Sequence, residues 1–269
     1  EHFYVSTTTG ASASVYREMQ RRVVEWRLNC VLHNLTGHMA AMNLAGPHCA
    51  AVLAGCASLA LHDAQFPYLA VRQGEIAGVP ARVLRVGFVG ERGYEIHVPA
   101  DRALEVWNAL TTGDVTPFGV EAQRVLRLEK GHLIVGQDTD GVTNPWEAGL
   151  GALVKEDKPF FVGQRSLAAL RRRGNRTQLV GFELADPDAP VLECHLVIEQ
   201  GDIAGRTTSV AWSAATGRRI GLAQVAPPLS AIGSTLHIRG EGGELHVATV
   251  VALPFYDPGH ERQKMGALS

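Results

Sequence analysis

The sequence predicts an α+β protein in which a mixed α/β region is followed by a small C-terminal antiparallel β-barrel. Up to residue 170, strand-like and helix-like segments alternate. From residue 179 to residue 255, short apolar segments are separated by glycine and proline and show no helical period. A basic segment at 171–176, expected to be a solvated linker, separates the two regions. We therefore expect two domains, residues 1–170 and residues 177–260.

The N-terminal region begins with a β-rich, aromatic segment at 2–9, which predicts a strand, followed by a helix at 13–26. Because the sequence opens in a strand without an initiator Met, we expect the N-terminal part of a longer protein to be missing. The predicted buried face of this first helix consists of Val15, Met19, Val23 and Trp26. The other elements expected in this region are strands at 39–47, 81–86 and 94–98, a helix beginning at Cys49, and helices at 103–110 and 120–130.

The C-terminal region contains six candidate strands, a number and spacing typical of a small barrel. They are expected at 179–184, 196–199, 207–212, 220–225, 235–239 and 245–251.

Composition argues against several classes of function. The 25 basic and 27 acidic residues leave a formal net charge of −2, which provides no field for nucleic acid or an anionic membrane. The longest apolar stretch, 49–61, is too short for a transmembrane helix. Four cysteines without CxxC spacing indicate free thiols in a reducing cytoplasm. His33, His38 and His48 lack a metal-site spacing, so no metal is expected.

Two charged residues are candidates for ligand contacts. Glu95 follows the glycine-rich turn 87–93, where it is suited to accept hydrogen bonds from a donor-rich heterocycle; the alternative is a surface ion pair. Arg127 lies in a helix and could clamp a carboxylate with its guanidinium; the alternatives are packing along the apolar surface or pairing with Glu129. The glycine spacings match neither a Rossmann nor a P-loop pattern, so no flavin or nicotinamide site is expected in this chain.

Three stretches of the sequence stand out by their order and spacing. They are GFVGERGYEI at 87–96, RLEKG at 127–131 with GQDTDG and NPWEAGL at 136–141 and 144–150, and FVGQRSL at 161–167. Together they resemble the glycine-cleavage T-protein (aminomethyltransferase) superfamily. The residues at 129–141 and the ending Phe255-Tyr256-Asp257-Pro258 are most similar to the C-terminal folate-binding region of the large (alpha) subunit of heterotetrameric sarcosine oxidase.

This resemblance implies a tetrahydrofolate site. Glu95 would contact the pterin ring, Arg127 would belong to the same site, and Phe88 stands where many relatives have a pocket tyrosine. Tyr68 and Trp146 are further candidates for aromatic walls. Plain packing is the alternative for Tyr68, and sealing of the domain interface is the alternative for Trp146.

The implied activity is capture of an amine-derived one-carbon unit as 5,10-methylenetetrahydrofolate, in a complex with other sarcosine oxidase-like subunits. The aspartate that acts as the catalytic acid in the family would lie upstream of residue 1, so no catalytic residue is assigned. A glycine-cleavage-type aminomethyltransferase and a non-catalytic folate-binding or assembly domain are the alternatives.

Overall fold

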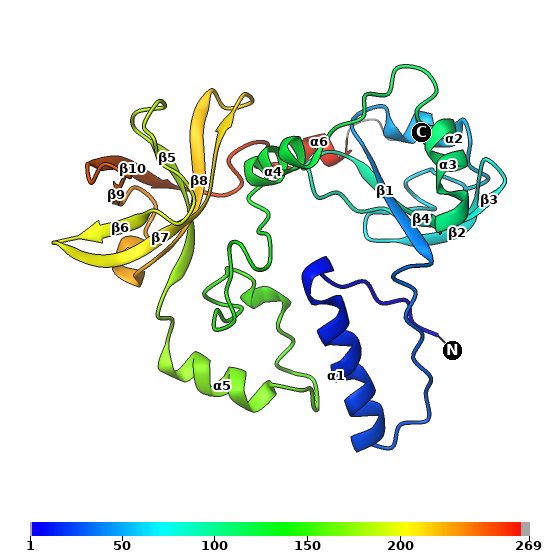
Figure 1. Cartoon of the computed structure of the whole chain (residues 1–269), viewed down its shortest axis with the longest axis horizontal. Helices are drawn as coiled ribbons and strands as arrows, with labels where there is room; N and C mark the ends of the chain where they lie inside the picture. Colours follow the sequence, from blue (N-terminus) through cyan, green and yellow to red (C-terminus); the bar gives the residue numbers. More distant parts are fainter. Residues whose placement is uncertain (1, 265–269) are drawn as a thin grey trace.

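A computed structural model describes residues 2–264 and shows an α+β architecture with a closed barrel in its C-terminal region. A four-stranded sheet lies at one end of the molecule and the six-stranded barrel at the other, with helix α4 (Val120–Glu129) between them (Figure 1). The predicted fold class is therefore confirmed.

The sheet has the order β1-β4-β3-β2, and every neighbouring pair is antiparallel. Its inner face packs against α2 and α3 through an apolar core that includes Tyr94, Ile96 and Val98 of β4. Because successive side chains of a strand point to opposite faces, Glu95 and His97 lie on the other face. The bounds are β1 Met39–Ala45, α2 Cys49–Ala54, β2 Val71–Ile76, β3 Val79–Leu84, β4 Gly93–Pro99, η2 Ala100–Arg102 and α3 Ala103–Leu110.

The barrel closes in the order β10-β5-β8-β7-β6-β9 through antiparallel pairs. Its interior is filled by valine, leucine, isoleucine and phenylalanine side chains. All six strands overlap the segments predicted from the sequence. Their bounds are β5 Gln178–Leu184, β6 Leu196–Glu199, β7 Asp202–Ser213, β8 Arg218–Val225, β9 Thr235–Arg239 and β10 Leu245–Val251, with η4 at Pro227–Leu229 and α6 at Glu261–Lys264.

The connection between the sheet and the barrel contains α4, a largely irregular segment with η3 (Gly151–Leu153), and α5 (Gln164–Arg173). In the segment 171–176, expected to be a solvated linker, residues 171–173 are exposed and form the last turn of α5. Three arginines there face the negative end of the helix dipole, which favours helix over an irregular linker.

The structure corrects two predictions and contains one strand that was not predicted. Residues 2–8 form no strand, and the first helix, α1 (Ser12–Glu25, preceded by η1 at Thr9–Ala11), contains no buried residue. The period of α1 identifies its apolar side, but burial depends on what packs against that side. Strand β2 was not predicted because its sequence, VRQGEI, is mostly polar, as suits its place at the sheet edge.

Two buried arginines hold the turn between β3 and β4. Arg92 Nη2 lies 2.6 Å and Arg85 Nη1 lies 3.0 Å from the same Asp63 carboxylate oxygen. Arg92 also donates to the Tyr94 hydroxyl at 3.0 Å, and Arg85 donates to the Phe66 carbonyl at 2.8 Å. These bonds tie the connection between α2 and β2 to the turn 85–92.

This cluster predicts a pH dependence of stability. The hydrogen bond from Arg92 holds the pKa of Asp63 below its ordinary value of 3.8. Because the folded-state pKa is depressed, the stabilisation is complete above the ordinary pKa and is lost as the pH falls through the folded-state value. Asp63→Asn should lower the free energy of unfolding at pH 7 by about 2 kcal/mol, less than a fully buried pair because Asp63 is 39% exposed.

Urea unfolding of the wild type and of Asp63→Asn between pH 7 and pH 3 measures both effects. The difference between the two proteins should shrink as the pH falls below about 4, the ordinary range of the carboxyl. Asp114→Asn, at an exposed position, is the control. A difference that stays constant over this range would contradict the assignment.

Candidate functional site

Glu95 lies on the face of β4 opposite the core, paired in register with Asn43 of β1 and Leu84 of β3. Its side chain is 29% exposed, and its Oε1 lies 2.5 Å from His97 Nε2. Among residues 2–264, no hydrogen-bond donor is recorded for its Oε2. The carboxylate therefore keeps acceptor capacity for a ligand.

Phe88 lies in the turn before β4 and is 37% exposed. Its ring stacks on His132 with centroids 5.7 Å apart and an interplanar angle of 22°. His132 Nδ1 lies 2.8 Å from the Phe88 carbonyl oxygen, which can only accept, so Nδ1 carries the proton. Burial lowers the pKa of His132, which favours the neutral ring with Nε2 as an acceptor.

The turn itself requires glycine at two positions. A Cβ on Gly87 would lie 2.5 Å from the carbonyl oxygen of Glu91, and Gly90 has a φ of +83°. The backbone conformation at these residues therefore sets where Phe88 stands relative to β4.

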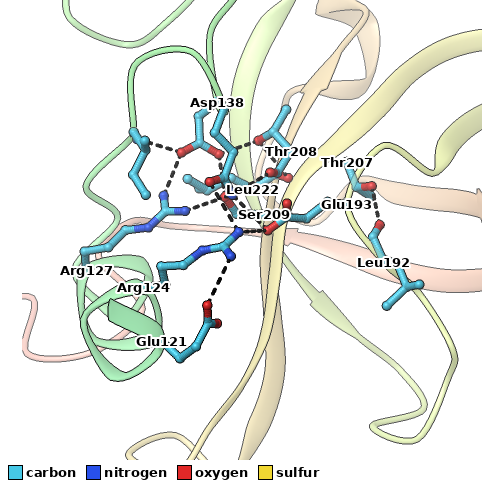
Figure 2. Close-up of polar contacts among 12 residues, drawn as sticks. Glu121, Arg124, Arg127, Asp138, Leu192, Glu193, Thr207, Thr208, Ser209 and Leu222 are labelled. Carbon is cyan, nitrogen blue, oxygen red and sulfur yellow. Dashed lines mark hydrogen bonds and ion pairs between the residues drawn. The ribbon is translucent and has the colours of Figure 1, made fainter. Parts of the chain in front are cut away.

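Arg127 is almost fully buried, and its guanidinium is bonded within the protein (Figure 2). Nη1 donates to Asp138 Oδ2 at 2.6 Å and to the His132 carbonyl at 2.9 Å, and Nη2 donates to Ser209 Oγ of β7 at 2.7 Å. The Asp138 side chain is 0% exposed and also accepts from Thr208 Oγ1 and Ser209 Oγ, each at 2.6 Å. The pair thus joins α4 to the barrel.

This geometry changes the interpretation of Arg127. Both Nη atoms already donate to protein acceptors, and Nε is buried without a partner. The alternative pairing with Glu129 does not form, since Glu129 Oε1 accepts from Ser213 Oγ at 2.6 Å instead. A carboxylate clamp by both Nη atoms would require breaking the Asp138 bond, and a folate contact of Arg127 stays a prediction.

The other charges of the segment 127–130 also face partners far along the chain. Lys130 Nζ lies 3.3 Å from Asp257 Oδ2, and the Tyr256 N–H donates to the Glu129 carbonyl at 3.0 Å. The C-terminal end of α4 is therefore bonded both to the barrel and to the C-terminal residues.

Trp146 and Tyr68 lie apart from the Glu95 contacts. The Trp146 ring packs closely against Gly151 and lies 5.8 Å from the Arg171 guanidinium carbon. Tyr68 is exposed, in the loop before β2. No recorded contact among the described residues joins either ring to Glu95, and their predicted role as aromatic walls stays untested.

Sequence reasoning missed three residues that organise these contacts: His97, Asp138 and Glu147. Burial opposes ionisation of Glu147, but N–H groups of Arg176 and Asn144, at 2.9 and 3.0 Å, lower its pKa. The sequence feature that could have identified them is a polar residue within an otherwise apolar or glycine-rich segment. Only the fold shows that the three are buried.

Two cavities, of about 210 Å³ and 370 Å³, lie near these elements. The smaller is bounded by the turn 87–93, α4 and the C-terminal segment, and the ion pairs Lys130–Asp257 and Glu91–Arg262 line it. The larger is lined by apolar and small polar residues of 135–154. None of the five predicted folate residues lines either cavity.

Within the part of the chain that the structure describes, no helix is long and apolar enough to cross a membrane. Nor does that part contain three or more His, Cys, Asp or Glu side chains grouped to hold a metal ion. All four cysteines fall in it and are free thiols.

Two family models match the chain. Residues 1–158 match the GCVT N-terminal domain, and residues 177–257 match the glycine cleavage T-protein C-terminal barrel domain. These matches confirm the resemblance found in the sequence motifs.

Relatives of two kinds are similar to the chain. An aminomethyltransferase of Synechococcus elongatus is 36% identical over 84% of this chain and 60% of its own length. Sarcosine oxidase subunit alpha of Corynebacterium sp. strain U-96 is 32% identical over 98% of this chain and 29% of its own length. The chain therefore spans less than two thirds of either relative.

The crystal structure of glycine cleavage system aminomethyltransferase T from Bartonella henselae has a similar fold. The TM-score is 0.80 at 23% identity, and the match covers 92% of this chain and 67% of that one.

The Arg127–Asp138 pair predicts a large stability effect. Asp138→Ala leaves the Arg127 charge buried without its partner and should lower the free energy of unfolding by about 3–5 kcal/mol. The matched control is Glu193→Ala, which breaks the ion pair between Glu193 and Arg124, in which both side chains are more than a third exposed. That change should cost less than about 1 kcal/mol. Urea unfolding measures both, and equal losses would contradict the assigned role of the buried pair.

Proposed function

We propose that this chain, which belongs to the glycine cleavage T-protein family, binds tetrahydrofolate and serves in one-carbon transfer. The observation that carries the proposal is the Glu95 carboxylate: it lies next to the glycine-rich turn, is partly exposed, and has one oxygen without a recorded protein donor.

The chemistry of Glu95 suits the pterin ring. The ring's amide and amino N–H groups are donors, and a carboxylate accepts such bonds with charge assistance. Phe88, with an exposed aromatic ring in the same turn region, can stack on a flat heterocycle. The residues at this turn therefore fit a reduced folate.

Tetrahydrofolate, when bound, supplies the two amine nitrogens that take up the one-carbon unit. The chain contributes binding and orientation: Glu95 fixes the heterocycle by charge-assisted bonds, and the rigid turn places the Phe88 ring. Arg127 contributes by holding α4 and the His132 carbonyl in place. No residue of this chain is assigned as the acid that assists proton movement.

Among the possible settings, we favour the folate-binding region of a sarcosine oxidase-like enzyme. Relatives described as sarcosine oxidase subunit alpha match 98% of this chain, against 84% for the Synechococcus aminomethyltransferase. In this setting the amine would be oxidised by flavin-bearing subunits, and the complex would act in the cytoplasm. A glycine-cleavage-type aminomethyltransferase and a non-catalytic folate-binding or assembly domain remain the alternatives.

Calorimetry with tetrahydrofolate tests the proposal. Wild type should bind, and Glu95→Gln should weaken binding about tenfold or more, because a hydrogen bond to a charged group contributes about 1.5–3 kcal/mol. Glu75→Gln, an exposed glutamate in β2, is the control and should bind as wild type does. No heat with wild type, or unchanged affinity in Glu95→Gln, would overturn the proposal.

A second measurement separates the alternatives. The rate at which formaldehyde reacts with tetrahydrofolate is measured with the protein and in buffer alone. A higher rate with the protein supports one-carbon capture, and binding without such acceleration supports a non-catalytic domain.

A further inference from the structure

Glu95 is the end of a chain of three side chains on the outer face of the sheet. His97, two residues further along β4, lies on the same face with Nε2 2.5 Å from Glu95 Oε1. The Tyr4 hydroxyl lies 2.7 Å from His97 Nδ1. Tyr4 comes from the irregular N-terminal segment, 93 residues away in the sequence.

The donors and acceptors along this chain can be assigned from chemistry. An ionised carboxylate only accepts hydrogen bonds, so His97 Nε2 carries a proton. In a neutral imidazole Nδ1 is then the acceptor, and the Tyr4 hydroxyl must donate to it. The hydrogen bonds therefore run in one direction: Tyr4 donates to His97, and His97 donates to Glu95.

A neighbouring arginine packs on Tyr4, and the sheet buries His97. The Arg82 guanidinium carbon lies 4.0 Å from the centre of the Tyr4 ring, and Arg82 is the β3 residue in register with His97. The His97 side chain is 6% exposed, whereas that of Glu95 is 29% exposed. The middle member of the chain, His97, is thus buried, and the ligand-accessible end is the Glu95 carboxylate.

We propose that His97 and Tyr4 are positioning residues for Glu95: they fix its carboxylate through Oε1 and leave Oε2 free for the N–H donors of the ligand. This rests on the proposed function, since the ligand is the reduced folate argued above. A glutamate on a bare strand face would sample several rotamers and lose more entropy on binding. Held by His97, it is already oriented.

The test uses the whole chain and two probes, tetrahydrofolate and its 2-desamino analogue, which lacks the amino donors but keeps the ring amide N–H. His97→Phe removes the bond to Oε1 and should weaken tetrahydrofolate binding about tenfold, while Tyr4→Phe frees the imidazole and should weaken it about threefold. Affinity for the analogue should fall less than affinity for tetrahydrofolate, because it makes fewer hydrogen bonds to the carboxylate. His97→Gln keeps an N–H donor and should restore most of the affinity.

Controls exclude a general loss of structure. Tyr16→Phe removes a tyrosine hydroxyl in α1, and His246→Phe removes a histidine that contacts a glutamate two residues earlier, Glu244. Both should bind as wild type does. Tyr4→Phe should have no further effect in a Glu95→Gln background.

A measurement without ligand judges the positioning chain independently. Nitrogen-15 NMR of the His97 ring should show the Nε2–H tautomer in wild type and a mixture in Tyr4→Phe. The Nδ1–H tautomer, or a spectrum unchanged by Tyr4→Phe, would overturn the proposal.

The outcomes separate the two proposals. If wild type and Glu95→Gln behave as expected while His97→Phe and Tyr4→Phe bind like wild type, the positioning role is wrong and the folate function stands. If wild type does not bind, the folate function is wrong, and the NMR result alone supports or overturns the contacts of His97.

Discussion

The buried pair of Arg127 and Asp138 is the interaction on which the arrangement of the two halves depends. It joins α4 to the loop that follows and, through Ser209 and Thr208, to strand β7 of the barrel. Two charges removed from water are tolerated because each has several hydrogen-bonding partners. Helix α4 and the barrel are therefore held together by directed bonds as well as by apolar contact of Leu128 with Ile220 and Leu222.

The same pair is also connected to the turn before β4. Arg127 bonds to the His132 carbonyl, and the His132 ring stacks on Phe88 and bonds to its carbonyl. A short series of bonded residues thus connects the barrel to the turn before β4. Arg127 can consequently act on the position of Phe88 through His132 while its own guanidinium is bonded to Asp138 and Ser209.

Glu95 is supported separately, from the outer face of the sheet. Its partners are His97 on its own strand and, beyond it, Tyr4 from the N-terminal segment. Two independent sets of contacts therefore converge near the glycine-rich turn. One orients the aromatic side chain and the other the carboxylate, a division that suits recognition of a flat heterocycle with N–H donors.

The sequence by itself determined the fold class, the six barrel strands, the glycine-rich turn and the family, because these depend on local periodicity, backbone preference and ordered motifs. It could not determine that α1 would have no buried residue, or that β2 would form at the sheet edge from a polar segment. Nor could it assign partners to Arg127, Glu129 and Lys130, which meet Asp138, Ser213 and Asp257. These pairings join residues from 11 to 127 positions apart, and only the tertiary structure decides which charges share a buried, low-dielectric space.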